Sequence, residues 1–130
     1  MKILILGGYG VFGGRLAELL SNIAELELLI SGRNQSKATA FCQTLRGEAK
    51  ATPVQLDRKD IHQKLAELTP DLVVDASGPF QQYGTARYVV IEACIHHGVN
   101  YLDFADAADF VFGVSQFDQA AREAGIFVLS

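Results

Sequence analysis

The stretch ILILGGYGVFGGRL, from Ile3 to Leu16, places a cluster of glycines directly after an apolar run. Residues Gly8 to Gly13 within it read Gly-x-Gly-x-x-Gly, and a helical pattern of apolar residues follows. Glycine-rich sequences match this motif by chance, so alone it says little. Between a strand and a helix it is typical of a loop that binds the pyrophosphate of a dinucleotide. The sequence therefore predicts a strand, a phosphate-binding loop and a helix, in that order.

The glycines of this loop have different expected parts. Gly8 lets the chain turn out of the strand, Gly10 lets a phosphate approach the backbone, and Gly13 lets the helix pack closely on the strand. The helix presents unpaired N–H groups and the positive end of its dipole to the phosphates. The alternative is a tight turn that binds nothing. The candidate cofactor-binding residues here are Gly8, Tyr9, Gly10, Val11, Phe12 and Gly13.

Short apolar runs alternate with helical patterns along the rest of the chain. The predicted strands are Lys2–Leu6, Glu27–Ser31, Thr52–Leu56, Leu72–Asp75, Tyr101–Phe104 and Ile126–Leu129. In the first helix, an apolar stripe is expected to face the sheet, formed by Phe12, Leu16, Leu19, Leu20 and Ile23. Such alternation predicts an α/β fold with right-handed crossovers. We expect a doubly wound parallel sheet of six strands in the order 3-2-1-4-5-6, a Rossmann sheet with helices on both faces, as one domain over residues 1–130.

Composition excludes several classes of partner. The chain has 130 residues, a net charge of −4 and no basic run, so it is a poor match for nucleic acid or an anionic membrane surface. Cys42 and Cys94 form no Cys-x-x-Cys pair, and we read them as reduced thiols of the core rather than zinc ligands. No apolar run has the length of a signal-peptide core or a transmembrane helix. We therefore expect a cytoplasmic protein.

The second predicted strand ends in Ile30-Ser31-Gly32-Arg33-Asn34, which contains no carboxylate. A site for NAD usually carries Asp or Glu near this point, where it accepts hydrogen bonds from the ribose 2′-OH. Here Ser31 can donate a hydrogen bond, and the guanidinium of Arg33 matches the geometry of a phosphate. We therefore predict NADP as the cofactor, with NAD less favoured. For Arg33 the alternative is a solvated surface position.

Two more predicted strands end at the same edge, because the carboxyl ends of parallel strands meet there. Asp57 follows the third strand, where it either contacts the adenine end of the cofactor or caps the next helix. Ser77, Gly78 and Pro79 follow the fourth strand, and their small size suits close passage of the nicotinamide half. These four residues complete the cofactor site predicted from the residues themselves.

Two other patterns are weighed and declined. Asp103, Asp106 and Asp109 could hold a divalent cation, but loop positions and helix capping explain their spacing better, so we predict no metal site. Tyr83 and Arg87 have the spacing of the Tyr-x-x-x-Lys pair of short-chain dehydrogenases. Arg replaces the Lys, and the pair follows the fourth strand instead of the fifth, so we predict no catalytic role for it. The sequence identifies no catalytic residue.

Five segments together resemble the saccharopine dehydrogenase family over essentially the whole chain: GGYGVFGGRLAELL, SGRN, VVDASGPFQQYG, ACIHHGVNYLDFADAADF and AAREAGIFVLS. The resemblance implies an NAD(P)-binding domain of an oxidoreductase that transfers hydride at a C–N bond of an amino-acid or polyamine substrate. It implies that Arg33 and Asn34 lie at the adenosine ribose or its 2′-phosphate. It places Tyr101 and Asp103 on the substrate side, where Asp103 would contact an amine.

Members of that family carry a second, substrate-binding domain, which this sequence lacks. We therefore expect a longer natural protein, a chain that binds cofactor with little or no turnover, and an exposed patch through which a homodimer could form. The main alternative is a non-catalytic module that senses NAD(P). A weaker one is a domain for another nucleotide-like ligand such as S-adenosylmethionine, which has no pyrophosphate for the glycine loop.

Overall fold

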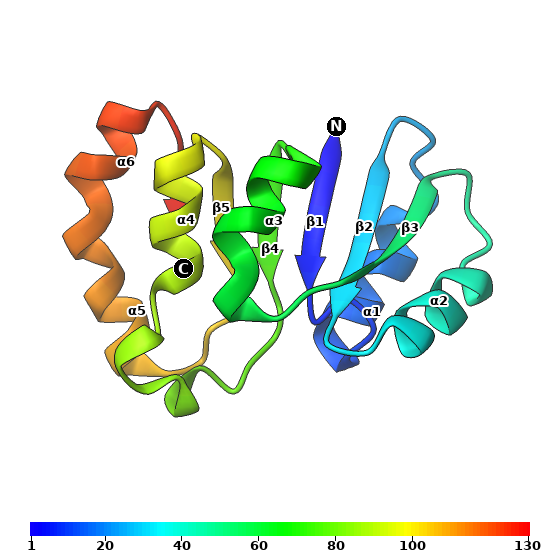
Figure 1. Ribbon diagram of the computed structural model, residues 1–130, viewed down its shortest axis with the longest axis horizontal. Helices are drawn as coiled ribbons and strands as arrows, with labels where there is room; N and C mark the ends of the chain where they lie inside the picture. The colour runs from blue at the N-terminus through cyan, green and yellow to red at the C-terminus, as the bar shows by residue number, and fades with distance from the viewer.

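The computed structural model describes residues 1–130 and is built around one parallel sheet of six strands (Figure 1). The strands are β1 (Lys2–Leu6), β2 (Glu27–Gly32), β3 (Lys50–Gln55), β4 (Leu72–Asp75), β5 (Asn100–Asp103) and β6 (Val128–Leu129). Their order is β3-β2-β1-β4-β5-β6, which confirms the predicted doubly wound sheet. The winding reverses between β1 and β4, and in such sheets ligands bind outside the carboxyl ends of the strands at this point.

Several strand ends differ from the prediction, because backbone pairing rather than apolar character sets them. β3 begins at Lys50, which pairs with Glu27, and β2 extends to Gly32, which pairs with Gln55. β6 is only two residues long, and Ile126 and Phe127 precede it. β3 is an edge strand, a position where Pro53 is tolerated.

Helices cover both faces of the sheet. α1 (Val11–Leu20) and α2 (Gln35–Thr44) lie on one face, while α3 (Ile61–Leu68), α4 (Val89–His97) and α6 (Asp118–Ala124) lie on the other (Figure 1). The short helix α5 (Ala108–Gly113) precedes α6. Single turns of 3₁₀-helix connect these elements: η1 (Arg58–Asp60), η2 (Phe80–Gln82), η3 (Gly84–Ala86) and η4 (Val114–Phe117). None of the helices combines the length and the apolar character needed to cross a bilayer.

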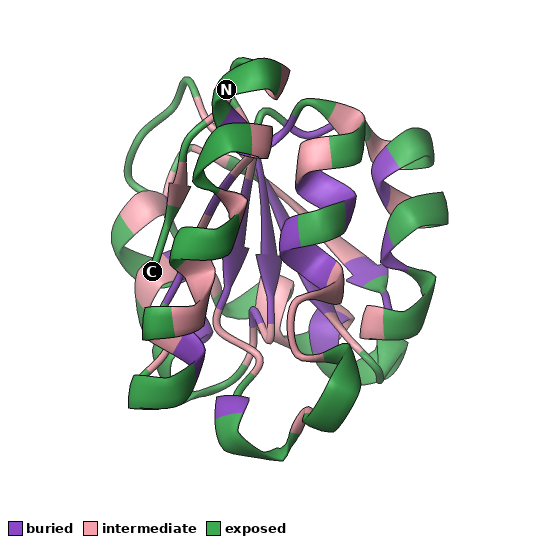
Figure 2. Cartoon of the chain, turned by 90° about the vertical axis from the view of Figure 1, so that its left-hand side faces the viewer, coloured by how far each residue is buried: buried purple, intermediate pink, exposed green.

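The core consists of two apolar layers separated by the sheet. β1 contributes Leu4 and Leu6 to the layer beneath α3 and α4, and Ile3 and Ile5 to the layer beneath α1 and α2. This alternation along a strand buried on both faces is what a doubly wound sheet requires. Figure 2 shows the buried strands between helices whose outer sides are exposed.

The buried side of α1 is not the predicted apolar stripe. Phe12, Leu19 and Ile23 are exposed, whereas Gly13, Gly14 and Ala17 are buried against the sheet. A Cβ on Gly13 would collide with the carbonyl oxygen of Gly7, so the helix lies too close to the loop for any larger residue there. The prediction was wrong because the closest packing uses the smallest residues, which apolar periodicity ignores.

Candidate functional site

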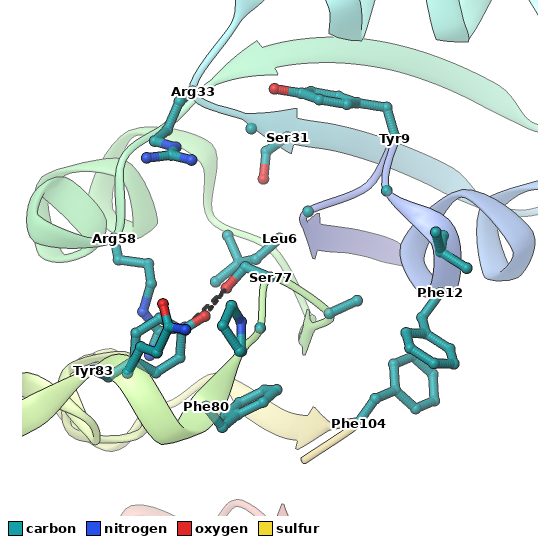
Figure 3. Close-up of a pocket in the computed structure, with 18 of the residues that line it drawn as sticks. Leu6, Tyr9, Phe12, Ser31, Arg33, Arg58, Ser77, Phe80, Tyr83 and Phe104 are labelled. Atoms are coloured by element: carbon teal, nitrogen blue, oxygen red, sulfur yellow. Dashed lines mark hydrogen bonds between the residues drawn. The ribbon is translucent and has the colours of Figure 1, made fainter. Parts of the chain in front are cut away.

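The largest hollow of the molecule is a cleft at the carboxyl ends of β1, β2, β3 and β4 (Figure 3). Its volume is about 810 Å³, within the usual range for small-molecule and cofactor sites. The loops that follow these four strands all contribute to its walls. Ten of the residues predicted for the cofactor line it: Tyr9, Gly10, Val11, Phe12, Ser31, Arg33, Asp57, Ser77, Gly78 and Pro79.

The glycine loop turns at Gly7, not at Gly8 as predicted. Gly7 has a φ of +68°, a left-handed conformation that favours glycine. Gly8 instead lies tightly between β1 and β2, and its N–H donates to the carbonyl oxygen of Ser31 at 2.9 Å. Gly10 lines the cleft, and its N–H donates to the carbonyl oxygen of Gly7 at 2.9 Å. The loop is thus held by its own backbone and leaves Gly10 open to a ligand.

The N-terminus of α1 is the anion-binding feature of the cleft. No side chain caps this helix, and no acidic residue lies in its first turn. The first N–H groups of a helix have no partner within the helix, and they carry the positive end of its dipole. Because Gly10 and Val11 line the cleft, these groups are available to a phosphate there.

Tyr9 connects the glycine loop to the loop after β2. Its hydroxyl accepts a hydrogen bond from the Asn34 N–H at 3.1 Å, and its ring lies so close to Gly32 that a Cβ there would overlap it. Asn34 does not line the cleft; its Oδ1 accepts from the Lys37 N–H at 2.9 Å and caps α2. Asn34 therefore shapes the loop, whereas the resemblance implied a contact with the cofactor.

Ser31 and Arg33 have different surroundings at the end of β2. The Ser31 hydroxyl has no exposed surface and donates to the carbonyl oxygen of Ile5 at 2.9 Å, so it is already used within the sheet. This corrects the prediction that it donates to the cofactor. Arg33 is exposed, lines the cleft and takes part in none of the ion pairs of the structure (Figure 3). Its guanidinium is available to an anion.

Asp57 is a helix cap that also lines the cleft. Its carboxylate accepts from the Lys59 N–H at 3.2 Å at the start of η1. The capping alternative is therefore present in the structure. A contact with the adenine end stays a prediction.

A polar network that sequence reasoning missed lies at the end of β4. Asp75 has no exposed surface and pairs with the guanidinium of Arg58. Ser77 donates to Asp75 from its N–H at 3.1 Å and from its hydroxyl at 2.6 Å. The Tyr83 hydroxyl lies 3.0 Å from the Ser77 hydroxyl, and the Arg58 guanidinium lies 3.9 Å from the centre of the Tyr83 ring. A carboxylate ending an apolar strand was the available signal, since a buried one needs a cation.

Burial also determines the state of Tyr83. It raises the pKa of the hydroxyl above its ordinary value, against the lowering effects of the Ser77 hydrogen bond and the Arg58 charge. The hydroxyl therefore stays protonated at neutral pH. Tyr83 enters the cleft as a neutral hydroxyl.

Tyr101 and Asp103 do not face the cleft, contrary to what the resemblance implied. Tyr101 has no exposed surface, and its hydroxyl donates to Asp103 at 2.9 Å. Asp103 also accepts from the Ala105 N–H at 2.9 Å and from the Ser130 hydroxyl at 3.0 Å. Neither residue lines the cleft. Buried with its partners, the pair holds the end of β5 in place.

The mouth of the cleft is apolar on one side. Phe12 and Phe104 are both exposed, and their ring centroids are 6.4 Å apart (Figure 3). No group of three or more His, Cys, Asp or Glu side chains is placed to hold a metal ion. The cleft therefore offers backbone N–H groups, two guanidinium groups, hydroxyls and aromatic rings.

The family model of the saccharopine dehydrogenase NADP-binding domain matches residues 3–129. The chain belongs to the saccharopine dehydrogenase NADP-binding domain family. The match confirms the resemblance inferred from the motifs and supports a dinucleotide as the ligand of this NADP-binding domain. A comparison with curated protein sequences found no significant match.

Solved structures share the fold of this NADP-binding domain. Apo saccharopine dehydrogenase (L-Glu forming) from Saccharomyces cerevisiae superposes with a TM-score of 0.71 and 18% identity, over 98% of this chain and 26% of that chain. A 3-oxoacyl-[acyl-carrier protein] reductase from Brucella melitensis has a TM-score of 0.67 and 16% identity, over 96% and 65% of the two chains. The enzyme WbmG from Bordetella bronchiseptica, solved with NAD, has a TM-score of 0.59 and 20% identity, over 80% and 37%. The NADP-binding domain thus spans about a quarter of the yeast enzyme.

Proposed function

We propose that the cleft binds NADP(H) in preference to NAD(H), within an oxidoreductase that transfers hydride at a C–N bond of an amino-acid or polyamine substrate. One observation carries the cofactor preference: the unpaired guanidinium of Arg33 lines the same cleft as the N-terminus of α1. A helix N-terminus suits the pyrophosphate, and a guanidinium at the end of β2 suits a phosphate on the adenosine ribose.

The absence of an acidic side chain at the end of β2 supports the same preference. Ser31-Gly32-Arg33-Asn34 contains no carboxylate to accept hydrogen bonds from a ribose 2′-OH or to repel a 2′-phosphate. A planar guanidinium binds phosphate through two parallel N–H donors, which an alkyl ammonium cannot do. Arg33 is therefore the residue that selects the phosphorylated cofactor in this proposal.

The proposed cofactor extends across the ends of the central strands. Its adenosine lies beside Arg33 and Asp57, its pyrophosphate at Gly10 and Val11, and its nicotinamide beside the loop after β4. The order follows from the strand order, because β2 and β4 lie on opposite sides of β1. Ser77, Gly78 and Pro79 line the end of the cleft near β4.

The proposed hydride transfer belongs to a protein longer than this chain. The family match supports an oxidoreductase, and the chain spans 26% of the yeast saccharopine dehydrogenase. We expect residues 1–130 alone to bind the cofactor without turning over an amino-acid or polyamine substrate. The carboxylate and hydroxyl implied on the substrate side, Asp103 and Tyr101, are buried away from the cleft.

That placement also favours a second candidate, an NAD(P)-sensing module without catalysis. The two candidates differ in one measurement on the longest natural form of the protein. Cofactor oxidation or reduction with amino-acid or polyamine substrates supports the enzyme. Cofactor binding with no turnover across that substrate class supports the module.

Calorimetric titration with NADPH and NADH tests the cofactor preference. We expect wild type to bind NADPH more tightly. Arg33→Ala should weaken NADPH binding by about tenfold or more, because a charged hydrogen-bonded contact contributes about 1.5–3 kcal/mol. NADH affinity should change little. Arg122→Ala removes an equal charge far from the cleft and should leave both affinities unchanged. Equal binding of the two cofactors by wild type would contradict the proposal.

A further inference from the structure

The hydrogen-bond order at the end of β4 determines which way the Tyr83 hydroxyl donates. Asp75 is a buried carboxylate paired with Arg58, and an ionised carboxylate only accepts hydrogen bonds. The Ser77 hydroxyl lies 2.6 Å from Asp75 Oδ1, a length typical of a hydroxyl donating to a carboxylate. The single proton of Ser77 is therefore committed to Asp75.

The remaining capacity of Ser77 Oγ is two acceptor positions. The Arg58 guanidinium, which has only donors, fills one of them at 3.0 Å. The Tyr83 hydroxyl, 3.0 Å away, fills the other, and it does so as a donor because Ser77 has no second proton to give. The direction of the Ser77–Tyr83 hydrogen bond thus follows from the charge on Asp75.

The Tyr83 oxygen is left as an acceptor. Its proton points to Ser77, and its ring is fixed between the Arg58 guanidinium at 3.9 Å and Phe80, whose ring centroid is 5.5 Å away. Tyr83 lines the cleft, beside Ser77 and on the β4 side (Figure 3). This wall of the cleft therefore presents a fixed hydrogen-bond acceptor to an N–H group of a ligand.

We propose that the Tyr83 hydroxyl oxygen accepts a hydrogen bond from the carboxamide N–H of nicotinamide, and so selects this ring over analogues that lack the amide. The inference rests on the proposed cofactor, since it assigns the β4 end of the cleft to the nicotinamide half. Arg58, Asp75 and Ser77 are positioning residues in this account. They fix the direction in which Tyr83 donates.

An analogue of the cofactor tests this contact directly. In 3-acetylpyridine adenine dinucleotide phosphate, a methyl group replaces the amide nitrogen and the carbonyl is kept. We expect wild type to bind NADP⁺ about fivefold more tightly than this analogue, the effect of one neutral hydrogen bond. Tyr83→Phe keeps the ring and should lower the affinity for NADP⁺ by about that factor, while the affinity for the analogue stays the same.

A matched variant and a fragment complete the experiment. Tyr88→Phe removes a hydroxyl that donates to the Phe110 carbonyl oxygen at 2.9 Å and does not line the cleft, so it should leave both affinities unchanged. Adenosine 2′,5′-bisphosphate, which has no nicotinamide, should bind wild type and Tyr83→Phe equally.

The outcomes separate this inference from the proposed function. Tyr83→Phe that weakens NADP⁺ and its analogue equally, or neither of them, would overturn the contact with the amide. Wild type that binds NADP⁺ and the analogue alike would overturn it too. Wild type that binds neither adenosine 2′,5′-bisphosphate nor NADP⁺ would overturn the proposed function together with this inference.

Discussion

At the scale of single residues, Asp75 is the most demanding position in the molecule. Its carboxylate has no exposed surface and depends on Arg58 and Ser77 for every side-chain partner in the structure. A buried carboxylate without a cation is costly, because it loses the solvation that water provides. The same pair that shapes the cleft therefore also affects the stability of the fold.

Arg58→Ala should lower the free energy of unfolding by about 3 kcal/mol, since it leaves a buried charge without its partner. Urea unfolding measures the change. Arg122→Ala is the matched control, because its pair with Asp118 is exposed on α6 and such pairs contribute about 1 kcal/mol or less. Similar losses in the two variants would show that the Arg58–Asp75 pair is not a buried, stabilising one.

At the scale of elements, the end of β5 carries a second buried carboxylate. Burial raises the pKa of Asp103, against the lowering effects of hydrogen bonds from the Ala105 N–H and the Tyr101 and Ser130 hydroxyls. The folded state therefore binds the Asp103 proton more tightly than the unfolded chain does. This contribution to stability is present below the unfolded pKa, near 4, and is lost as the pH rises through the folded pKa.

Unfolding measured from pH 7 down to pH 4 tests this linkage. Relative to Asp103→Asn, which does not titrate, wild type should gain stability as the pH falls. Cofactor affinity of Asp103→Asn should match that of wild type at neutral pH, because Asp103 does not line the cleft. A stability difference that is independent of pH would contradict the raised pKa.

The elements also show how far the sequence predicts this molecule. Strand order and the position of the glycine loop were predictable, because alternation and the Gly-x-Gly-x-x-Gly motif depend on local sequence. The buried face of α1 was not, since Gly13, Gly14 and Ala17 are buried by close approach of the backbone and not by apolar character. Ends of strands such as β6 depend on pairing with a neighbour, which a single strand does not reveal.

Much of the cleft was predictable for the same reason. Parallel strands bring their carboxyl ends to one edge, so residues that follow β1, β2 and β4 had to meet there. What the sequence did not reveal is which side chains are already used. Ser31 donates within the sheet, Asn34 caps a helix, and Arg58 reaches Asp75 from a different loop. Such pairings depend on side-chain geometry between segments that are distant in the chain.

At the scale of the whole molecule, the proposed ligand lies across the point where the sheet reverses its winding. The N-terminus of α1 and Arg33 lie on one part of the cleft, and the Ser77–Tyr83 pair lies at the β4 end. One ligand that is anionic at one end and carries an amide at the other fits this distribution of groups. The central claim is that a dinucleotide occupies the full length of the cleft.

A ¹H–¹⁵N NMR titration with NADPH tests this claim most directly. The account predicts saturable shifts in the amides of Gly10–Gly13, Ser31–Arg33 and Ser77–Tyr83, with little change in the α4 residues His96 and His97, which do not line the cleft. Shifts confined to one end of the cleft, shifts centred outside it, or no shifts at millimolar NADPH would contradict the account.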